Sequence, residues 1–440
     1  MNNRHNFKII GPCRNQIEMS MSCLDDLIPA DHKARAIWDF VNKMDTTSCF
    51  DSINTFYKQA GRPTTCPKVL LALWLYSILD GNSSARKLEE LCEYHAVYKW
   101  LRGGAPINRT MLAEFRSHDT TKFDDLLTSC LAVMVQAGLI KDEDFSQDGT
   151  RVKANAGVKS YRREGTLLEL KQSIKEYIKK LDAEGSSNKY EQRVKEASRR
   201  IAQNRLDRVD AALKNLEEAR EEKIKNREQS GPPPTEKELG EVRASTTDPE
   251  ARKMKMGDGG FRLAYNVQFA TGLDSRVIYG VGVVKTADPG TAPMMMCRVH
   301  HRLKKIGLPE AKNWIGDAAY SSKKDIESVA GLFPGCRYYA PPKTHKGVDP
   351  KKAKTTDSEP VKKWRKLIDT DEVKQVYQHR SSTAEFSNAQ TKNIGMNKFS
   401  LRGLIKVRGE ALLYAIVQNI SRYFDLIGRK NDECVSGVPM

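Results

Sequence analysis

Apolar residues recur every three or four positions through the first third of the chain, which predicts helices over residues 16–140. The clearest positions are Ala34, Ile37, Trp38, Val41, Leu70, Leu71, Trp74, Leu75, Ile78 and Leu79. Pro67 lies where a first helical turn would begin, Asn82-Ser83-Ser84 can cap another helix, and Gly103-Gly104 breaks a third. We therefore expect an all-α N-terminal domain over residues 1–143.

Beyond residue 143 the pattern changes to short strands that alternate with helices. Strands are expected at residues 144–156, 264–270, 276–284, 313–317 and 337–340. Helices are expected at residues 292–304, 322–329, 371–392 and 404–425. The pair Asp148-Gly149 predicts a turn within the first strand. The pattern indicates an α/β domain, a mixed sheet flanked by helices, built from residues 144–162 and 244–425 and followed by a tail at 426–440.

Residues 163–243 separate the first strand from the others and have a different composition. Their apolar residues recur at helical spacing in two runs among Lys, Arg, Glu and Gln. The runs are Leu167, Leu170, Ile174, Ile178 and Leu181, then Val194, Ala197, Ile201, Leu206, Val209, Leu213 and Leu216. Gly231-Pro232-Pro233-Pro234 ends the second run. We expect an inserted antiparallel hairpin or coiled coil with a phase slip after Ile201 and a Pro-rich linker.

The charge balance suggests a partner. The chain has 73 Lys and Arg against 56 Asp and Glu, a formal net charge of +17. This excess favours a polyanion such as nucleic acid, since each neutralised phosphate releases counterions, although a merely soluble basic protein is the alternative. The nine cysteines are scattered without zinc-type spacing, so we expect reduced thiols. No apolar stretch reaches the roughly 18–20 residues of a membrane span, so a cytoplasmic protein without membrane contact is expected.

One helix of the N-terminal region has the residues expected of a DNA reader. Residues 106–116 place Asn108 and Arg109 at the start of a helix and Arg116 near its end. Asn and Arg at the N-terminal end of a helix suit contacts with base edges in a major groove. A plain helical bundle explains the same pattern equally well.

Three acidic residues of the α/β region are the candidates for catalysis. Asp148 lies at the end of the first expected strand, Asp317 lies at the end of a later strand, and Glu385 falls within a helix. Carboxylates at strand ends lie where α/β sheets bind ligands, and oxygen ligands suit Mg²⁺. Asp142 and Asp144 are weaker alternatives to Asp148. Asp288 precedes Pro289-Gly290, where capping of the next helix is the simpler interpretation.

The ordered motifs resemble the DDE insertion-sequence transposases, in the branch with a Tyr, Arg, Glu, Lys signature. The matching blocks are Asp148-Gly149-Thr150-Arg151-Val152-Lys153-Ala154-Asn155-Ala156, Asp248-Pro249-Glu250-Ala251-Arg252, Gly316-Asp317-Ala318-Ala319-Tyr320, the set Tyr377, Arg380, Glu385 and Lys392, and Phe399-Ser400-Leu401-Arg402-Gly403. Phe115-Arg116 resembles the leading domain of that family. The similarity runs over nearly the whole chain.

The resemblance implies an RNase H-like catalytic core in which Asp148, Asp317 and Glu385 hold two Mg²⁺ ions, with Mn²⁺ able to substitute. Lys392, Arg380 and Tyr377 would contact DNA or its phosphates. Four residues separate Arg380 from Glu385 where the family has three, whereas Glu385 and Lys392 keep the family spacing. Seven residues are close to two helical turns, so Glu385 and Lys392 share a face, and Arg380 points there less clearly.

The expected protein is a transposase that binds the terminal inverted repeats of an insertion sequence, cleaves the DNA ends and joins the 3′-hydroxyls to target DNA. Its partners would be double-stranded DNA, both element ends and target, and further copies of itself in a dimer or larger assembly. It would act in the prokaryotic cytoplasm, in association with the nucleoid. A catalytically silent DNA-binding relative and an RNase H-like nuclease without strand transfer are the alternatives.

Overall fold

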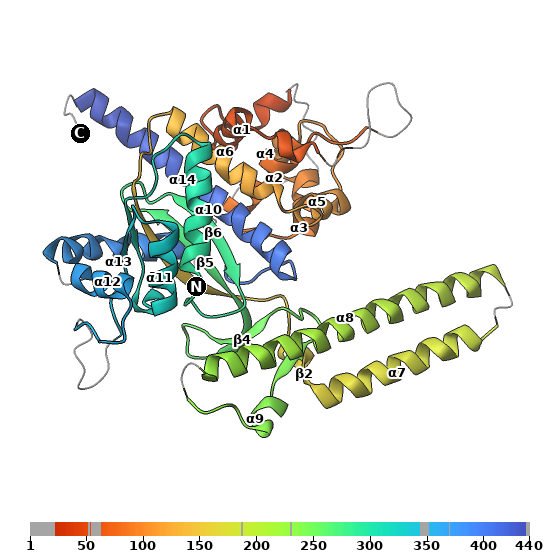
Figure 1. Ribbon diagram of the computed structural model, residues 1–440. Helices are drawn as coiled ribbons and strands as arrows, with labels where there is room; N and C mark the ends of the chain where they lie inside the picture. The colour runs from red at the N-terminus through yellow and green to blue at the C-terminus, as the bar shows by residue number, and fades with distance from the viewer. Residues whose placement is uncertain are drawn as a thin grey trace, which may run out of the picture.

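The fold centres on a six-stranded mixed sheet (Figure 1). The computed structural model describes residues 23–51, 53, 63–185, 188–228, 231–343, 352–368 and 370–436. The strands of the sheet are β1 (Asp144–Lys153), β4 (Arg252–Lys255), β5 (Phe261–Gly272), β6 (Ile278–Val284), β7 (Asn313–Ile315) and β8 (Arg337–Tyr339). The order is β4-β5-β1-β7-β8, and β6 also pairs with β5. β1 is antiparallel to β5 and parallel to β7, so the central strand joins an antiparallel half to a parallel half.

Helices cover both faces of this sheet, as the sequence predicts for an α/β domain. They are α10 (Ala292–Lys305), α11 (Lys323–Leu332), α12 (Glu359–Ile368), α13 (Asp371–Asn393) and α14 (Leu404–Ser436). Gln147 of β1 bonds to Thr291 at the start of α10. Thr271, opposite the neighbouring Ser146, bonds to Ser387 of α13. Because adjacent strand residues point to opposite faces, α10 and α13 lie on opposite sides of the sheet.

The N-terminal region is helical throughout its described part, residues 23–51, 53 and 63–143. Its helices are α1 (Lys33–Lys43), α2 (Pro67–Leu79), α3 (Ala85–Tyr94), α4 (Ala96–Arg102), α5 (Arg109–Ser117) and α6 (Lys122–Gln136). The predicted start at Pro67 is confirmed, Ser84 caps α3, and Gly103 ends α4 with a left-handed backbone. Residues 16–22 lie outside the described residues. These helices share one hydrophobic core with α14 and the sheet, so the region is packed onto the α/β domain.

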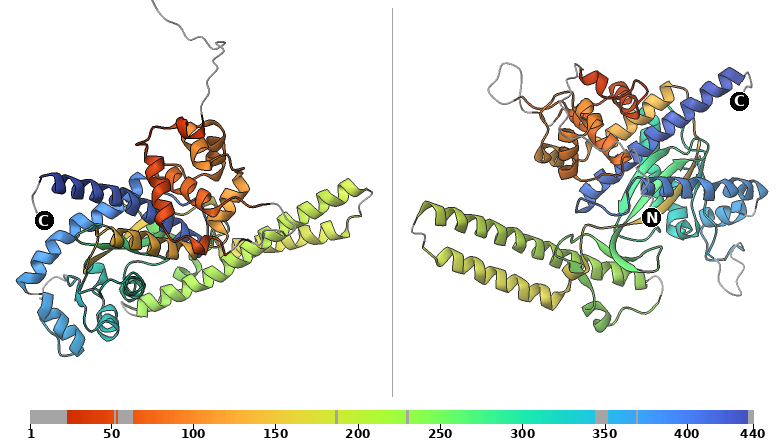
Figure 2. Two further views of the ribbon diagram at one scale, coloured as in Figure 1. Left: turned by 90° about the horizontal axis from the view of Figure 1, so that it is seen from above. Right: turned by 180° about the vertical axis from the view of Figure 1, so that it is seen from behind.

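An antiparallel helical hairpin projects from the sheet, as predicted for residues 163–243 (Figures 1 and 2). It consists of α7 (Glu164–Ala183) and α8 (Lys189–Glu228). The short strands β2 (Tyr161–Arg163) and β3 (Arg243–Ser245) pair at its base, and α9 (Glu236–Gly240) precedes β3. Leu167, Ile174, Val209 and Leu216 are buried in its separate core.

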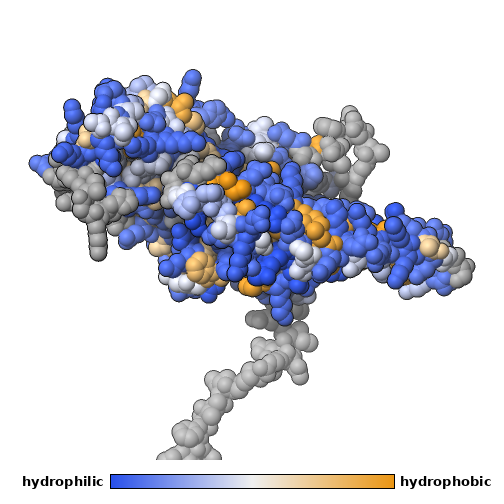
Figure 3. Space-filling model, turned by 60° about the horizontal axis from the view of Figure 1, so that its bottom comes forward, coloured by the Kyte–Doolittle hydropathy of each residue, from blue (hydrophilic) through white to orange (hydrophobic). Residues whose placement is uncertain are grey.

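The outer part of the hairpin differs from the predicted pattern. Val194 and Ile201 are 48% and 69% exposed, and the neighbouring Ala202 takes the buried position. Adjacent helix residues point about 100° apart, so presenting the small Ala202 to α7 turns Ile201 outward. Leu168, Tyr177 and Tyr190 are exposed as well, and apolar patches interrupt the mostly hydrophilic surface of the hairpin (Figure 3).

The predicted turn at Asp148-Gly149 is wrong, because β1 runs straight through both residues. A Cβ atom built on Gly149 would lie 2.1 Å from the Asp288 Oδ1 atom, so this glycine permits a close approach within a strand.

Two further sequence expectations can be compared with the structure. The seven cysteines whose side chains the structure describes are all free thiols. None of the helices in the described parts of the chain combines the length and the apolar content that crossing a membrane requires.

Candidate active site

Asp148 and Asp317 lie at the same end of the β1–β7 strand pair. In the parallel register, Ser146 lies opposite Ile315, the last residue of β7. Asp148 is two residues beyond Ser146, and Asp317 is two residues beyond Ile315. Asp148 is therefore within its strand rather than at its end, but β7 has already ended beside it. The short β7 thus opens the sheet at the position where the two carboxylates meet.

The electrostatics of Asp148 reflect this position. Burial raises the pKa of Asp148 to about 6, the Arg380 guanidinium opposes the rise, and the Asp317 and Asp288 carboxylates add to it. Repulsion among carboxylates and desolvation both favour the protonated acid. A bound cation would offset the repulsion among the carboxylates and favour the ionised form of Asp148.

The Asp317 carboxylate is oriented by the backbone that follows it. Asp317 is the N-cap of the short 3-10 helix η4 (Ala318–Tyr320), and its Oδ1 atom accepts the Ala319 N–H at 2.7 Å. This bond holds the carboxylate at the end of β7 and leaves its second oxygen available in the same place.

Helix α13 reaches Asp148 through two side chains. The Arg380 guanidinium donates to Asp148 Oδ1 at 3.2 Å, and the Asn388 amide donates to Asp148 Oδ2 at 2.8 Å. Residues eight apart in a helix lie roughly 80° apart, within one broad face, and both side chains reach Asp148 of β1. Arg380, which was expected to point less clearly toward the face of Glu385 and Lys392, thus contacts Asp148 directly. Sequence reasoning missed Asn388, because its partner Asp148 lies 240 positions away in the chain.

The other predicted residues of α13 have different surroundings. Glu385 lies on an exposed part of the helix. Tyr377 packs beside Ile315 and Tyr339, at the ends of β7 and β8, and its ring lies 5.9 Å from the Arg380 guanidinium. Lys392 is half-buried in the last turn.

A fourth carboxylate, Asp288, belongs to the site. The capping interpretation is wrong, because Thr291 is the N-cap of α10. The Asp288 Oδ1 atom instead accepts the Asn266 and Gln268 amides at 2.9 and 2.7 Å. It occupies the space that the missing side chain of Gly149 leaves over β1. No local sequence pattern marks this arrangement, because residues from three separate segments build it.

A buried hydrogen-bond network centred on Gln268 lies beside the carboxylates. The Tyr320 hydroxyl, the Gln147 amide and the Thr291 hydroxyl all donate to Gln268 Oε1, at 2.6, 2.9 and 3.2 Å. The Trp314 indole donates to Gln147. Burial raises the pKa of Tyr320, and the carboxylates of Asp288, Asp148 and Asp317 raise it further. Asp148, Asp288 and Asp317 therefore all lie within electrostatic range of this one hydroxyl, and we call these three residues the acidic cluster.

The chemistry of these donors fits a hard cation. Carboxylate oxygens are the ligands that a hard cation prefers, and the buried Asn388 Oδ1 atom beside Asp148 has no hydrogen-bond partner among the described residues. The Arg380 guanidinium already supplies a positive charge there. In the described parts of the chain, however, no three His, Cys, Asp or Glu side chains lie close enough to share one metal ion.

Two family models match the chain, and together they identify it. Residues 22–118 match a model described as Transposase domain (DUF772), and residues 341–424 match the Transposase DDE domain. Both matches are to transposase families and indicate a DDE-type insertion-sequence transposase. The DDE match contains α13 with Arg380, Glu385 and Asn388, whereas Asp148 and Asp317 lie outside it. No curated protein and no solved structure matches the transposase.

The first matched region contains the three predicted DNA contacts of the transposase. Asn108 caps α5 by accepting the Met111 N–H at 2.8 Å, which confirms the predicted helix start. Asn108 and Arg109 are exposed. Arg116 is only 6% exposed, lies 4.3 Å from the Trp74 ring and donates to the Ser83 carbonyl. The expectation that Arg116 contacts DNA therefore does not carry over, because its guanidinium is in the protein interior.

Replacing Arg116 with Ala will destabilise the transposase by roughly 2–4 kcal/mol, because it removes the stacking on Trp74 and leaves a cavity. Arg109→Ala, at an exposed position of the same helix, will change stability by less than about 0.5 kcal/mol. Urea unfolding followed by circular dichroism measures both values. Equal stabilities of the two variants would contradict the buried role of Arg116.

Proposed function

We propose that this transposase binds the terminal inverted repeats of an insertion sequence, cleaves the DNA ends and joins the 3′-hydroxyls to target DNA. The observation that carries the proposal is the register of β1 and β7, which places Asp148 and Asp317 at the same end of this strand pair, in a sheet that packs against α13 of the matched DDE region. The sheet supports an RNase H-like core, since its central strand is antiparallel to β5 and parallel to β7. Its place of action would be the DNA of a prokaryotic cytoplasm.

In this proposal Asp148, Asp317 and Glu385 hold two Mg²⁺ ions, for which Mn²⁺ can substitute. Bound there, the ions would activate the attacking oxygen and neutralise charge on the phosphodiester. Asn266 and Gln268 fix Asp288, and the Ala319 N–H fixes Asp317, so the acidic cluster needs little reorganisation. Arg380, Lys392 and Tyr377 would orient the DNA backbone, and Asn108 and Arg109 would read the element ends.

We further propose that two or more copies assemble on DNA through the hairpin, because two element ends must be paired. Val194 and Ile201 support this role, since they are apolar and face solvent on a charged hairpin.

Replacing Ile201 with Glu will prevent this assembly, because a carboxylate would be buried in the interface. Light scattering of the protein on DNA should show a smaller complex. Gln203→Glu, which introduces the same charge two residues away at an exposed polar position, should leave the complex unchanged. If the Ile201→Glu protein forms a complex of unchanged size, this face of the hairpin is not the assembly interface.

A catalytically silent DNA-binding relative is the second candidate. Two observations favour it: no three acidic, His or Cys side chains of the described chain converge on one ion, and Arg380 neutralises Asp148.

Strand transfer separates the candidates. Labelled DNA with free 3′-hydroxyl element ends is incubated with the protein, a supercoiled plasmid and Mg²⁺. The proposed transposase will attach the label covalently to the plasmid. A nuclease without strand transfer will cut flanked ends but leave the plasmid unlabelled, and a silent relative will bind the ends and do neither.

A further inference from the structure

A positively charged site lies away from the acidic cluster, where the N-terminal helices meet the sheet. A pocket of about 500 Å³ is formed there by the start of α6, the end of β6, α8, α10 and the start of α14. We name it the junction pocket, and the lining residues that matter are Thr121, Lys285, Thr286, Arg298, Ile405 and Arg408.

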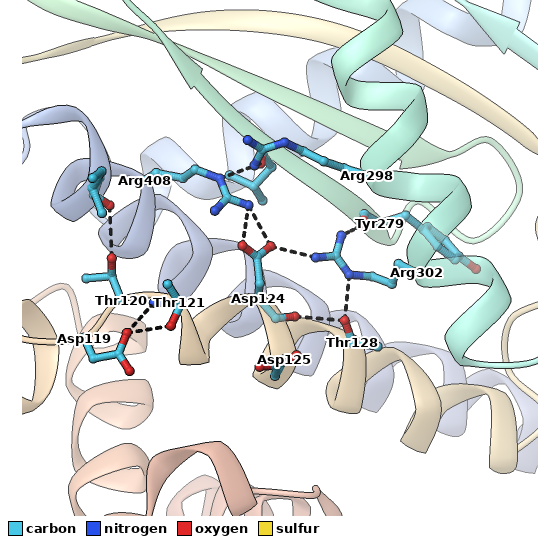
Figure 4. Close-up of polar contacts among 12 residues, drawn as sticks. Asp119, Thr120, Thr121, Asp124, Asp125, Thr128, Tyr279, Arg298, Arg302 and Arg408 are labelled. Atoms are coloured by element: carbon cyan, nitrogen blue, oxygen red, sulfur yellow. Dashed lines mark hydrogen bonds and ion pairs between the residues drawn. The ribbon is translucent and has the colours of Figure 1, made fainter. Parts of the chain in front are cut away.

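Two arginines bind one carboxylate beside this pocket, and a third arginine lies next to them. Asp124 of α6 accepts bonds from Arg302 at 2.9 Å and from Arg408 at 2.7 Å (Figure 4). Arg298 has no carboxylate partner among the described residues. Its guanidinium and that of Arg408 both donate to the Val281 carbonyl, at 3.2 and 3.3 Å. Two guanidinium groups are therefore held side by side with too little negative charge to balance them.

The pKa of Arg298 reflects this excess of positive charge. Burial lowers the pKa of Arg298, and the neighbouring Arg408 lowers it further. The other charged residues of the pocket do not offset the excess, because Glu222 pairs with Arg252, and Lys285 is occupied by Glu218. A partly buried positive cluster that faces an open pocket is stabilised by an anion.

The pocket is connected to the candidate active site. Thr286 lines the pocket, and its carbonyl accepts the Asn266 amide, which also donates to Asp288. These bonds link the wall of the pocket to Asp288 of the acidic cluster. Paired guanidinium groups match the oxygens of a phosphodiester better than a single ammonium would.

We propose that Arg298 and Arg408 in the junction pocket bind a backbone phosphate of the DNA that occupies the active site. This inference rests on the proposed function, since it requires that the protein binds DNA. It adds a contact that joins the N-terminal helices, the sheet and the DNA at one place, because Asp124 of α6 holds Arg408 in position.

The test measures binding of a labelled DNA duplex of mixed sequence from about 0.05 to 0.2 M salt, because a phosphate contact is independent of base sequence. Arg298→Gln should bind roughly tenfold more weakly at the lower salt concentration. It should also reduce the slope of log affinity against log salt by about 0.9. Arg298→Lys keeps the charge and should keep most of the slope. Lys304→Gln removes one exposed charge from the same helix and should change neither quantity.

A second variant does not depend on replacing a packed residue. Ile405 is 74% exposed and lines the pocket, so Ile405→Glu places a carboxylate there without disturbing the core. It should weaken binding as Arg298→Gln does. If Arg298→Gln and Ile405→Glu show the same affinity and the same salt slope as Lys304→Gln, while the wild type binds DNA, the pocket proposal is wrong and the proposed function stands. If the wild type binds no duplex, both proposals fail.

Discussion

Replacing Asp148 with Asn will abolish DNA cleavage and stabilise the fold at neutral pH. Cleavage should fall by roughly 10³-fold or more, because the variant loses a negative charge that the reaction needs. Stability should rise because a buried carboxylate in an acidic cluster is unfavourable. The pKa of Asp148 is about 6 in the folded protein, against an ordinary value of 3.8. One pKa unit corresponds to about 1.4 kcal/mol, so the gain should be roughly 2 kcal/mol once partial solvent screening is allowed for.

The raised pKa of Asp148 determines how this gain in stability changes with pH. A carboxyl whose folded pKa is raised stabilises the fold below its unfolded pKa, and this contribution is lost as the pH rises through the folded pKa. The advantage of Asp148→Asn should thus be near zero around pH 4 and complete above about pH 6. Urea unfolding at several pH values measures it, and Asp274→Asn, at an exposed turn, is the control. Lower stability than wild type at pH 7 would mean that the Arg380 ion pair outweighs burial.

Replacing Gly149 with Ala will damage the site and the fold together. The new Cβ atom would lie 2.1 Å from Asp288 Oδ1, 2.4 Å from Gln268 Nε2 and 2.8 Å from Asn266 Oδ1. These atoms cannot simply move away, because Asn266 and Gln268 bond to Asp288, and Gln268 also accepts the Tyr320 hydroxyl. Overpacking of this kind costs about 1–3 kcal/mol. The new methyl group should displace Asp288 and Gln268, and with Gln268 the hydrogen bond that holds Tyr320 in the turn after Asp317. Cleavage should therefore fall at least tenfold more than the loss of stability explains.

Gly157→Ala is the matched control for this variant, because a Cβ atom at Gly157 meets nothing within 4 Å and the backbone there is extended. It should leave stability within about 0.5 kcal/mol of the wild type and cleavage unchanged. Wild-type cleavage by Gly149→Ala would show that the close approach of Asp288 to β1 has no part in the function.

The sequence was sufficient where periodicity and local chemistry determine the structure. Helix starts at Pro67 and Asn108 follow from capping and proline rules, and the hairpin follows from its apolar spacing. Asp317 follows β7, as the sequence pattern predicts, whereas Asp148 lies within β1 rather than at its end.

The sequence was insufficient where distant segments meet. A local rule predicts a turn at Asp148-Gly149, whereas tertiary packing with Asp288 explains the glycine. Arg116 is a residue of the type that contacts DNA, but its guanidinium packs against Trp74 of another helix. The bond from Asn388 to Asp148 and the arginines around Asp124 join residues more than 150 positions apart, so no local pattern marks them.

The most direct test of the central claim, that an acidic site at the end of β7 cleaves DNA, is a cleavage assay on labelled DNA that carries the element's own ends. Wild type and Asp317→Ala are compared with Mg²⁺ present, and Asp274→Ala is the control at an exposed aspartate. We expect cleavage at the ends by the wild type and the control, and none by Asp317→Ala, with equal end binding by all three. Equal binding with no cleavage by the wild type under Mg²⁺ or Mn²⁺, or unchanged cleavage by Asp317→Ala, would contradict the claim.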